Sequence, residues 1–193
     1  MIYIGLVGYA GSGKDTAYQL IRLFINKEAE RLAFADKLKD IADNMLEIAD
    51  LERVARSSDR EVKEQIRPLL VWLGEYARKQ DKDYWIDKII PDVIYLKKAS
   101  CPMVVFTDVR YLNEAKYVID HSGYLVHIKS SSMPANSTEA NSIAEIIRTY
   151  KDSPCFYSVY NAKENRAEFL KVLRPVIEAI EKDFSKYAEA SKA

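Results

Sequence analysis

One lysine follows three closely spaced glycines, a pattern that could bind a polyphosphate. The stretch GYAGSGKDTAYQL, Gly8 to Leu20, holds three of the six glycines of the chain within six residues. Glycine has no Cβ, so its backbone N–H groups can approach a phosphate closely and turn inward. The spacing G-x-x-x-x-G-K is that of a P-loop. We therefore predict a phosphate cradle in which Lys14 bridges the β- and γ-phosphates. A tight glycine turn between a strand and a helix is the alternative.

Asp15 departs from the commonest P-loop, where a hydroxyl at this position binds Mg²⁺. A carboxylate here could hold the metal through water, or cap the helix that follows. Thr16 brings its hydroxyl one residue later, where it could reach an α-phosphate. The spacing resembles the G-x-x-G-x-G-K-x-T of nucleoside monophosphate kinases and favours them over GTPases and motor proteins. The predicted nucleotide-binding residues are Gly8, Ala10, Gly11, Ser12, Gly13, Lys14, Asp15 and Thr16.

A second acid follows an apolar run in MVVFTD, which has the form of a Walker B strand. In parallel sheets the site lies at the carboxyl ends of the strands, so Asp108 would face the P-loop if the two strands are neighbours. Asp108 would then hold Mg²⁺, or alternatively cap the next helix. Arg110 could contact the transferring phosphoryl group, or form a surface ion pair with Glu114. Our predicted catalytic residues are Lys14, Asp108 and Arg110.

An acceptor must be held in line with the donor, with positive charge around the equatorial oxygens. Arg67 and Arg78 are eleven residues apart, which is about 16 Å along one helix. This is too far for both to grip one phosphate, and solvated surface is the alternative for either. The aromatic residues nearby could stack on a base, although helical spacing favours the core. The acceptor-site candidates are Asp36, Lys37, Lys39, Arg67 and Arg78, with Trp72, Tyr76, Tyr84 and Trp85 as the aromatic set.

These residues need strands that end at one edge of a sheet, with helices between them. Apolar runs predict strands at 2–7, 31–35, 103–108, 124–129 and 155–160, and helical spacing predicts helices after Lys14 and at 36–49, 66–80, 84–96, 113–121 and 169–180. Pro68 is expected in a first helical turn. Such alternation predicts an α/β fold with a parallel sheet covered on both faces. We expect one domain over 1–193, with a helical acceptor-binding insertion at 36–100.

The polar segment 130–154 could be a lid that excludes water from the reaction. Arg148 and Lys151 are the cations that it could bring, and an ordinary polar surface loop is the alternative. Ser142 and Glu145 are spaced as a capping box for a short helix around 143–147.

Bulk composition narrows the function classes. The 193 residues carry zero formal net charge, which argues against a general nucleic-acid partner. No apolar stretch reaches the roughly 18 to 20 residues that span a bilayer, and none is typical of a signal peptide. Two cysteines without ligand spacing predict reduced thiols in a cytoplasmic protein. His121 and His127 are expected to be structural.

Four segments together resemble the viral deoxynucleoside monophosphate kinases of tailed bacteriophages. They are GYAGSGKDTA, FADKLKDIA, RPLLVWLGEYARKQDKDYWIDKI and VVFTDVRYLNEAKYVIDHSGYLVHI. The DVRYLNEA piece, which resembles D-V-R-x-x-N-E-A, is the most specific. The similarity covers most of residues 2–130. Where that family often has H-x-S-E, this chain has Asn136 to Glu139.

The resemblance implies transfer of a phosphoryl group from ATP, with Mg²⁺, to a deoxynucleoside monophosphate, on an adenylate-kinase-like core. The implied location of the protein is the cytoplasm, which is that of the host cell if the protein is viral. The implied assembly is a homodimer. The residues that match positions around the acceptor pocket are Asp36, Lys37, Arg67, Arg78 and Trp85; those after the third strand are Asp108, Arg110, Asn113 and Glu114. Two alternatives stay open. One is a phosphomevalonate-type kinase, which shares S-G-K-D and D-x-R, and the other is a nucleotide-binding protein without transferase activity.

Overall fold

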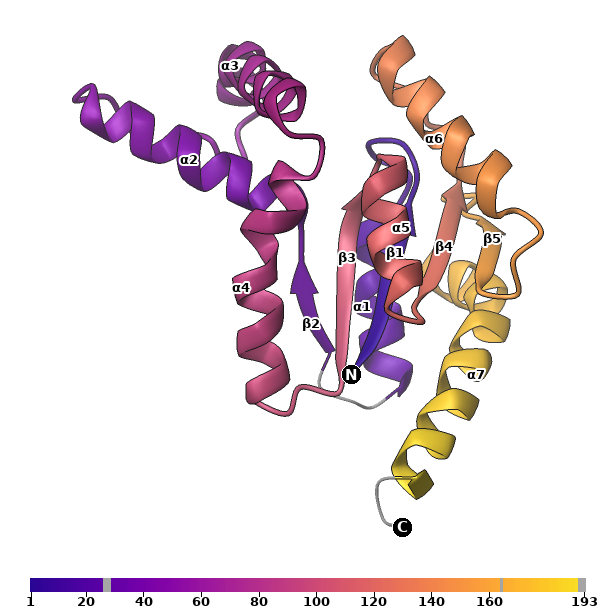
Figure 1. Ribbon diagram of the computed structural model, residues 1–193. Coiled ribbons are helices and arrows are strands. Elements are labelled where there is room, and N and C mark those ends of the chain that lie inside the picture. Colours follow the sequence, from indigo (N-terminus) through magenta and orange to yellow (C-terminus); the bar gives the residue numbers. More distant parts are fainter. Residues whose placement is uncertain (26–28, 164, 191–193) are drawn as a thin grey trace. The chain divides into compact units, whose positions relative to one another are not determined.

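The computed structural model describes residues 1–25, 29–163 and 165–190, and side chains within these ranges up to residue 182 (Figure 1). Two compact units make up the chain. The first comprises Met1–Arg31 and Tyr95–Ala193, and the second comprises Leu32–Ile94. Among the described residues, no helix has the length and apolarity that crossing a membrane requires.

A five-stranded parallel sheet forms the centre of the first unit. Its strands are β1 (Ile2–Val7), β2 (Ala29–Leu32), β3 (Met103–Val109), β4 (Tyr124–Lys129) and β5 (Phe156–Tyr160), in the order β2-β3-β1-β4-β5. β1 pairs in parallel with both β3 and β4, and β4 pairs in parallel with β5. β1 is buried along its whole length, as expected for a strand covered on both faces. The loop that follows β1 therefore lies beside the carboxyl ends of β3 and β4.

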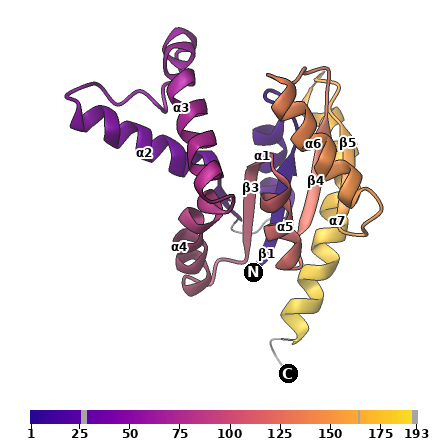
Figure 2. The same cartoon turned by 45° about the horizontal axis from the view of Figure 1, so that its top comes forward.

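Helices cover both faces of this sheet. On one face, α1 (Lys14–Ile25) packs against α7 (Arg166–Ala190), and both contribute to the main apolar core. On the other face lie α5 (Leu112–Asp120) and α6 (Ser137–Tyr150), which contact each other, as Figure 2 shows. The predicted α/β class with a parallel sheet is confirmed.

The second unit is helical. It contains α2 (Phe34–Ile48) and α3 (Arg60–Gln80), which pack together, and most of α4 (Tyr84–Lys98). The indole N–H of Trp85 donates to the Gly74 carbonyl at 3.2 Å, and the Asp43 carboxylate accepts from the N–H of Ala55 at 2.8 Å. These two bonds tie α4 to α3, and the loop after α2 to α2 itself.

Three predicted elements are wrong in their bounds. The strand predicted at 31–35 lies at Ala29–Leu32, because Phe34 is the buried first residue of α2 and not a strand residue. α3 begins at Arg60, since the Asp59 carboxylate caps the N–H groups of Glu61 and Val62. Pro68 consequently lies inside this helix and not in its first turn.

The third error concerns the helix predicted around 143–147. α6 starts at Ser137, where the Asn136 side chain accepts from the N–H of Glu139 at 2.8 Å. Ser142 therefore lies within the helix, with its hydroxyl donating to the Glu139 carbonyl, and it is not a cap. The segment 130–154 thus carries a helix of 14 residues that packs against α5.

Candidate active site

The glycine loop between β1 and α1 has backbone conformations that only glycine adopts readily. Gly8, Gly11 and Gly13 have φ angles of 151°, 71° and 103°. A Cβ on Gly8 would lie 2.7 Å from the carbonyl oxygen of Ile128, and one on Gly13 would lie 2.2 Å from the amide nitrogen of Asn161. The loop is closed by a hydrogen bond from the Ser12 N–H to the Tyr9 carbonyl at 3.1 Å.

Lys14 reaches back over this loop from the first turn of α1. Its ammonium donates to the carbonyl oxygens of Gly8 and Tyr9, both at 2.7 Å, and only 8% of the residue is exposed. The positive end of α1 and the Lys14 ammonium thus meet in one small volume. A cation beside a helix N-terminus is an arrangement that can bind an anion.

Several charged side chains lie close enough to Lys14 to shift its pKa. Burial lowers the pKa of Lys14 to about 8, and the positive charge of Arg110 acts in the same direction. The carboxylates of Glu139, Asp108 and Asp15 oppose this shift. The neighbours of Lys14 therefore include one cationic side chain, just after β3, and three carboxylates.

The buried Ser12 hydroxyl adds a second sign of a ligand. The residue is 1% exposed, and its oxygen has no hydrogen-bond partner among the described residues. Buried hydroxyls are nearly always hydrogen-bonded in native proteins. An oxyanion that enters the loop would add an acceptor near this hydroxyl.

The carboxyl end of β3 lies beside β1, as the Walker B interpretation requires. Pairing between the two strands is interrupted by a bulge, because Gly5 faces Phe106 whereas Val7 faces Val109. The extra residue falls just before Val109, so the bulge changes the direction of the side chains at the strand end. Asp108, in this bulge, is half-buried.

Arg110 is held at its backbone by one acid and faces a different acid with its guanidinium. The buried Glu114 carboxylate accepts from the N–H groups of Arg110 and Tyr111 at 2.8 and 3.1 Å. The Arg110 guanidinium lies 3.5 Å from a carboxylate oxygen of Glu139. The predicted surface ion pair between Arg110 and Glu114 is therefore wrong: Glu114 is 1% exposed and fixes the backbone, and its predicted contact with the substrate stays a prediction.

Glu139 is marked in the sequence only as the end of the segment that replaces H-x-S-E, and the sequence predicts no role for it in the site. Its side chain is 6% exposed, and one oxygen accepts from the N–H of Ala135 at 2.6 Å. The other oxygen, next to Arg110, has no hydrogen bond in the described part of the chain. A buried carboxylate without compensation is costly, so the Arg110 charge stabilises it.

The carboxylates near the loop fit a magnesium ion whose other ligands are water and phosphate oxygens. No group of three or more metal-binding side chains is found among the described residues. Mg²⁺ commonly uses only one or two carboxylates, the remaining ligands being water and phosphate oxygens. Asp108 and Asp15, both close enough to act on the Lys14 charge, are the two carboxylates that could hold it.

The acceptor candidates of the second unit are engaged with acids. The Lys37 ammonium lies 2.6 Å from Asp92, and Arg67 forms two hydrogen bonds with Glu64, at 2.9 and 3.0 Å. Asp36 lies 3.3 Å from Arg56 and 3.8 Å from Lys39. The two arginines of α3 are on one helix, as the spacing assumed.

Arg78 and the aromatic residues differ in exposure. Arg78 is half-buried and donates to the Gly74 carbonyl at 3.3 Å. Trp72 and Tyr76 are about half-exposed and stack with ring centroids 5.3 Å apart. Trp85 is 2% exposed and its indole N–H is used within the unit, so it is a core residue and we correct its prediction as a substrate contact.

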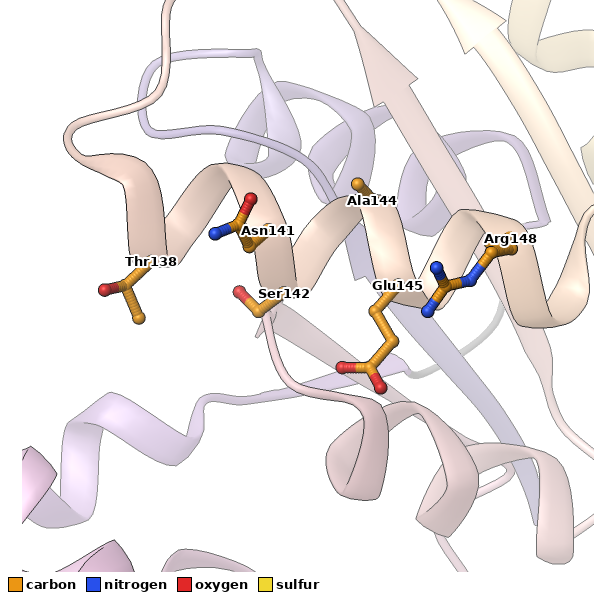
Figure 3. Close-up of a pocket in the computed structure, with 6 residues that line it drawn as sticks. All are labelled: Thr138, Asn141, Ser142, Ala144, Glu145 and Arg148. Carbon is orange, nitrogen blue, oxygen red and sulfur yellow. The ribbon is translucent and has the colours of Figure 1, made fainter.

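Polar side chains follow one another along the exposed side of α6 (Figure 3). Arg148, predicted as a lid cation, lies there, and Lys151 is exposed just beyond the helix. A shallow pocket is lined by Thr138, Asn141, Ser142, Ala144, Glu145 and Arg148. The lining of the pocket includes one carboxylate, of Glu145, and one guanidinium, of Arg148.

Comparisons with known proteins show a relative by sequence and structures of similar fold. No protein-family model matches the chain. The chain is 28% identical, over 170 aligned residues, to a protein of Acanthamoeba polyphaga mimivirus described as "Putative deoxynucleotide monophosphate kinase"; the alignment covers 74% of this chain and 81% of that protein.

Among solved structures, dephospho-CoA kinase from Campylobacter jejuni matches 93% of this chain and 97% of its own, at 15% identity and a TM-score of 0.53. The fold is that of a P-loop kinase. Shikimate kinase from Aquifex aeolicus matches 92% of the chain at 14% identity, with a TM-score of 0.40.

Proposed function

We propose that this chain is a kinase that transfers a phosphoryl group from ATP to a deoxynucleoside monophosphate. One observation carries the proposal: a buried lysine bridges two loop carbonyls at the positive end of a helix, in a loop with three glycines at positive φ. The acceptor class is supported by the similarity to the mimivirus protein.

The donor half begins with the Lys14 ammonium. Its two hydrogen bonds of 2.7 Å to carbonyl oxygens are replaced, in the proposed complex, by contacts with the β- and γ-phosphates. The loop N–H groups and the first turn of α1 provide further donors. The phosphates compensate the cost of burying the Lys14 charge, which the lowered pKa of about 8 reflects.

Charge for the transfer step comes from Arg110. Its backbone is fixed by Glu114 and its guanidinium is balanced by Glu139, so the side chain is already ordered near Lys14. Ordered cations lower the barrier of phosphoryl transfer because the charge on the equatorial oxygens is then stabilised without reorganisation. Asp108 and Asp15 are the residues that would hold a magnesium ion, which would neutralise charge on the triphosphate.

We propose that cations of the second unit bind the phosphate of the acceptor. Arg67 forms a bidentate pair with Glu64 on the exposed surface of α3, and a phosphate presents two oxygens in a similar geometry. Lys37 is the other cation that we propose for this role, and Asp36 is proposed to accept from a sugar hydroxyl. Arg78, about 16 Å from Arg67 along α3, would act elsewhere in the acceptor site or be structural. Arg148 and Lys151, on and after α6, are proposed to contact the nucleotide when the segment 130–154 acts as a lid.

A substrate panel tests the proposal. ADP release would be followed with ATP, Mg²⁺ and each of dGMP, dTMP, dCMP, dAMP and mevalonate 5-phosphate. We expect turnover with at least one deoxynucleotide and none with mevalonate 5-phosphate. The reverse preference would support a phosphomevalonate-type kinase, and ATP binding without any turnover would support a non-catalytic nucleotide-binding protein.

Lys14→Met should abolish turnover. The matched control is Lys116→Met on α5, which removes an exposed lysine that pairs with Asp120, four residues on. Turnover by Lys14→Met at the rate of this control would contradict the donor site.

A further inference from the structure

Asn161 lies 149 residues after Ser12 in the chain, yet it is hydrogen-bonded to the glycine loop. Its side-chain amide nitrogen donates to the Ser12 carbonyl at 3.0 Å, and the bond is buried. The residue is 7% exposed. It follows β5 directly and is not part of the P-loop motif.

Two other hydrogen bonds fix Asn161 itself. Its backbone N–H donates to the carbonyl of Lys129, at the end of β4, at 2.8 Å. Its side-chain oxygen accepts from the N–H of Lys163 at 3.0 Å. Because that oxygen is used by an N–H donor, the amide nitrogen must be the atom that faces Ser12. The hydrogen bond to the end of β4 therefore helps to determine where the amide donor lies.

The bond to Ser12 determines the direction of the neighbouring N–H group. In a trans peptide the C=O and the N–H of the next residue point in opposite directions. The structure contains no cis peptide bond among its described residues. With the Ser12 carbonyl directed at Asn161, the N–H of Gly13 points away from Asn161.

The Ser12–Gly13 peptide can flip easily because a glycine follows it. Gly13, at a φ of 103°, tolerates both orientations of the preceding peptide at little cost in backbone energy. A flipped Ser12–Gly13 peptide would direct a carbonyl oxygen, and not an N–H, at an incoming phosphate. The Asn161 amide is a donor that stabilises only one of the two orientations.

We propose that Asn161 is a positioning residue that holds the Ser12–Gly13 peptide with its N–H directed at the donor phosphates. The inference rests on the proposed function only in that the loop binds a triphosphate. The absence of a Cβ on Gly13 is part of the same arrangement, since a Cβ would lie 2.2 Å from the Asn161 amide nitrogen.

The test measures ATP binding without an acceptor, by isothermal titration calorimetry. Asn161→Asp keeps the shape and the oxygen that accepts from Lys163, but it removes the donor to Ser12. Asn161→Ala removes the donor without adding charge. We expect Kd for ATP to rise about ten-fold or more in Asn161→Ala, because the Gly13 N–H then loses its hydrogen bond to a charged phosphate, and further in Asn161→Asp.

Asn165→Ala is the matched control. Asn165 is four residues further along, and its side chain accepts from the N–H of Glu168 at 2.9 Å, at the start of α7. Its loss loosens the same region without touching the glycine loop. It should lower the melting temperature and leave Kd for ATP unchanged.

Steady-state kinetics separate positioning from general damage. The Asn161 variants should raise KM for ATP and leave KM for the acceptor unchanged. Kd values within two-fold of wild type in folded Asn161→Ala would overturn the inference, as would an equal rise in Asn165→Ala. If one Asn161 variant does not fold, the other decides. Failure of the wild type to bind ATP, or binding without turnover, would instead contradict the proposed function.

Discussion

The ion pair between Arg110 and Glu139 allows a sharp test of the candidate site, because its two members differ in burial. Glu139 is 6% exposed and Arg110 is 43% exposed, with 3.5 Å between their nearest charged atoms. At an effective dielectric constant of about 20, Coulomb's law gives an upper limit of about 5 kcal/mol. Solvent around Arg110 reduces this, and we expect a coupling of about 1–2 kcal/mol.

A double-mutant cycle measures that coupling. Arg110→Ala leaves a buried carboxylate uncompensated and should lower the free energy of unfolding by about 2 kcal/mol, whereas Glu139→Gln should lower it by about 1 kcal/mol. The double variant should lose less than the sum of the two. Urea denaturation of the four proteins provides the values. The exposed pair of Lys116 and Asp120 is the control, with an expected coupling below about 0.5 kcal/mol.

Activity measurements separate the role of Arg110 in stability from its proposed role in phosphoryl transfer. Adding Glu139→Gln to Arg110→Ala should recover stability, because no buried charge is then left unpaired, but it should not recover phosphoryl transfer. A coupling between Arg110 and Glu139 no larger than that of the control pair would refute the electrostatic reasoning. Recovery of transfer in the double variant would refute a direct role of Arg110.

Three further predictions follow from single residues. Gly13→Ala should abolish ATP binding, since its Cβ would lie 2.2 Å from the Asn161 amide nitrogen at a φ of 103°; calorimetry that finds wild-type affinity would contradict this. Glu114→Ala should lower the free energy of unfolding by about 2–3 kcal/mol, because two buried N–H groups lose their acceptor; urea denaturation checks it, and a loss under about 0.5 kcal/mol would count against it. Burial lowers the pKa of His127 to about 4, so the unfolded chain binds more protons than the folded one between pH 6.5 and 4, and stability falls as pH falls through that window. His127→Gln should remove up to about 3 kcal/mol of that loss, and an unchanged pH dependence of unfolding would disprove it.

Local sequence patterns predicted most of the fold. The apolar runs of β1, β3, β4 and β5 and the helical spacing of α1 and α7 needed no information beyond neighbouring residues. The errors arose where the pattern was ambiguous. LAF resembles a strand, but Phe34 is buried in the first turn of α2. The cap at Asp59 was hidden in a polar stretch, so α3 was predicted too short.

The candidate site was predicted only where the residues are close in sequence or on paired strands. The glycine loop is one continuous motif, and the Asp108 prediction depended on β1 and β3 being neighbours, which they are. Glu139 and Asn161 come from segments 29 and 149 residues from their partners, counting 139 − 110 and 161 − 12. No local pattern predicts the role of either one, since these roles depend on which strand ends and helices meet in three dimensions.

A crystal structure with a non-hydrolysable ATP analogue would test the central claim most directly. We predict that the β-phosphate lies within the loop of residues 8–16, and that the Lys14 ammonium has moved from the carbonyls of Gly8 and Tyr9 to the phosphate oxygens. Triphosphate density elsewhere, or a Lys14 ammonium still bonded to both carbonyls beside the bound analogue, would contradict the account.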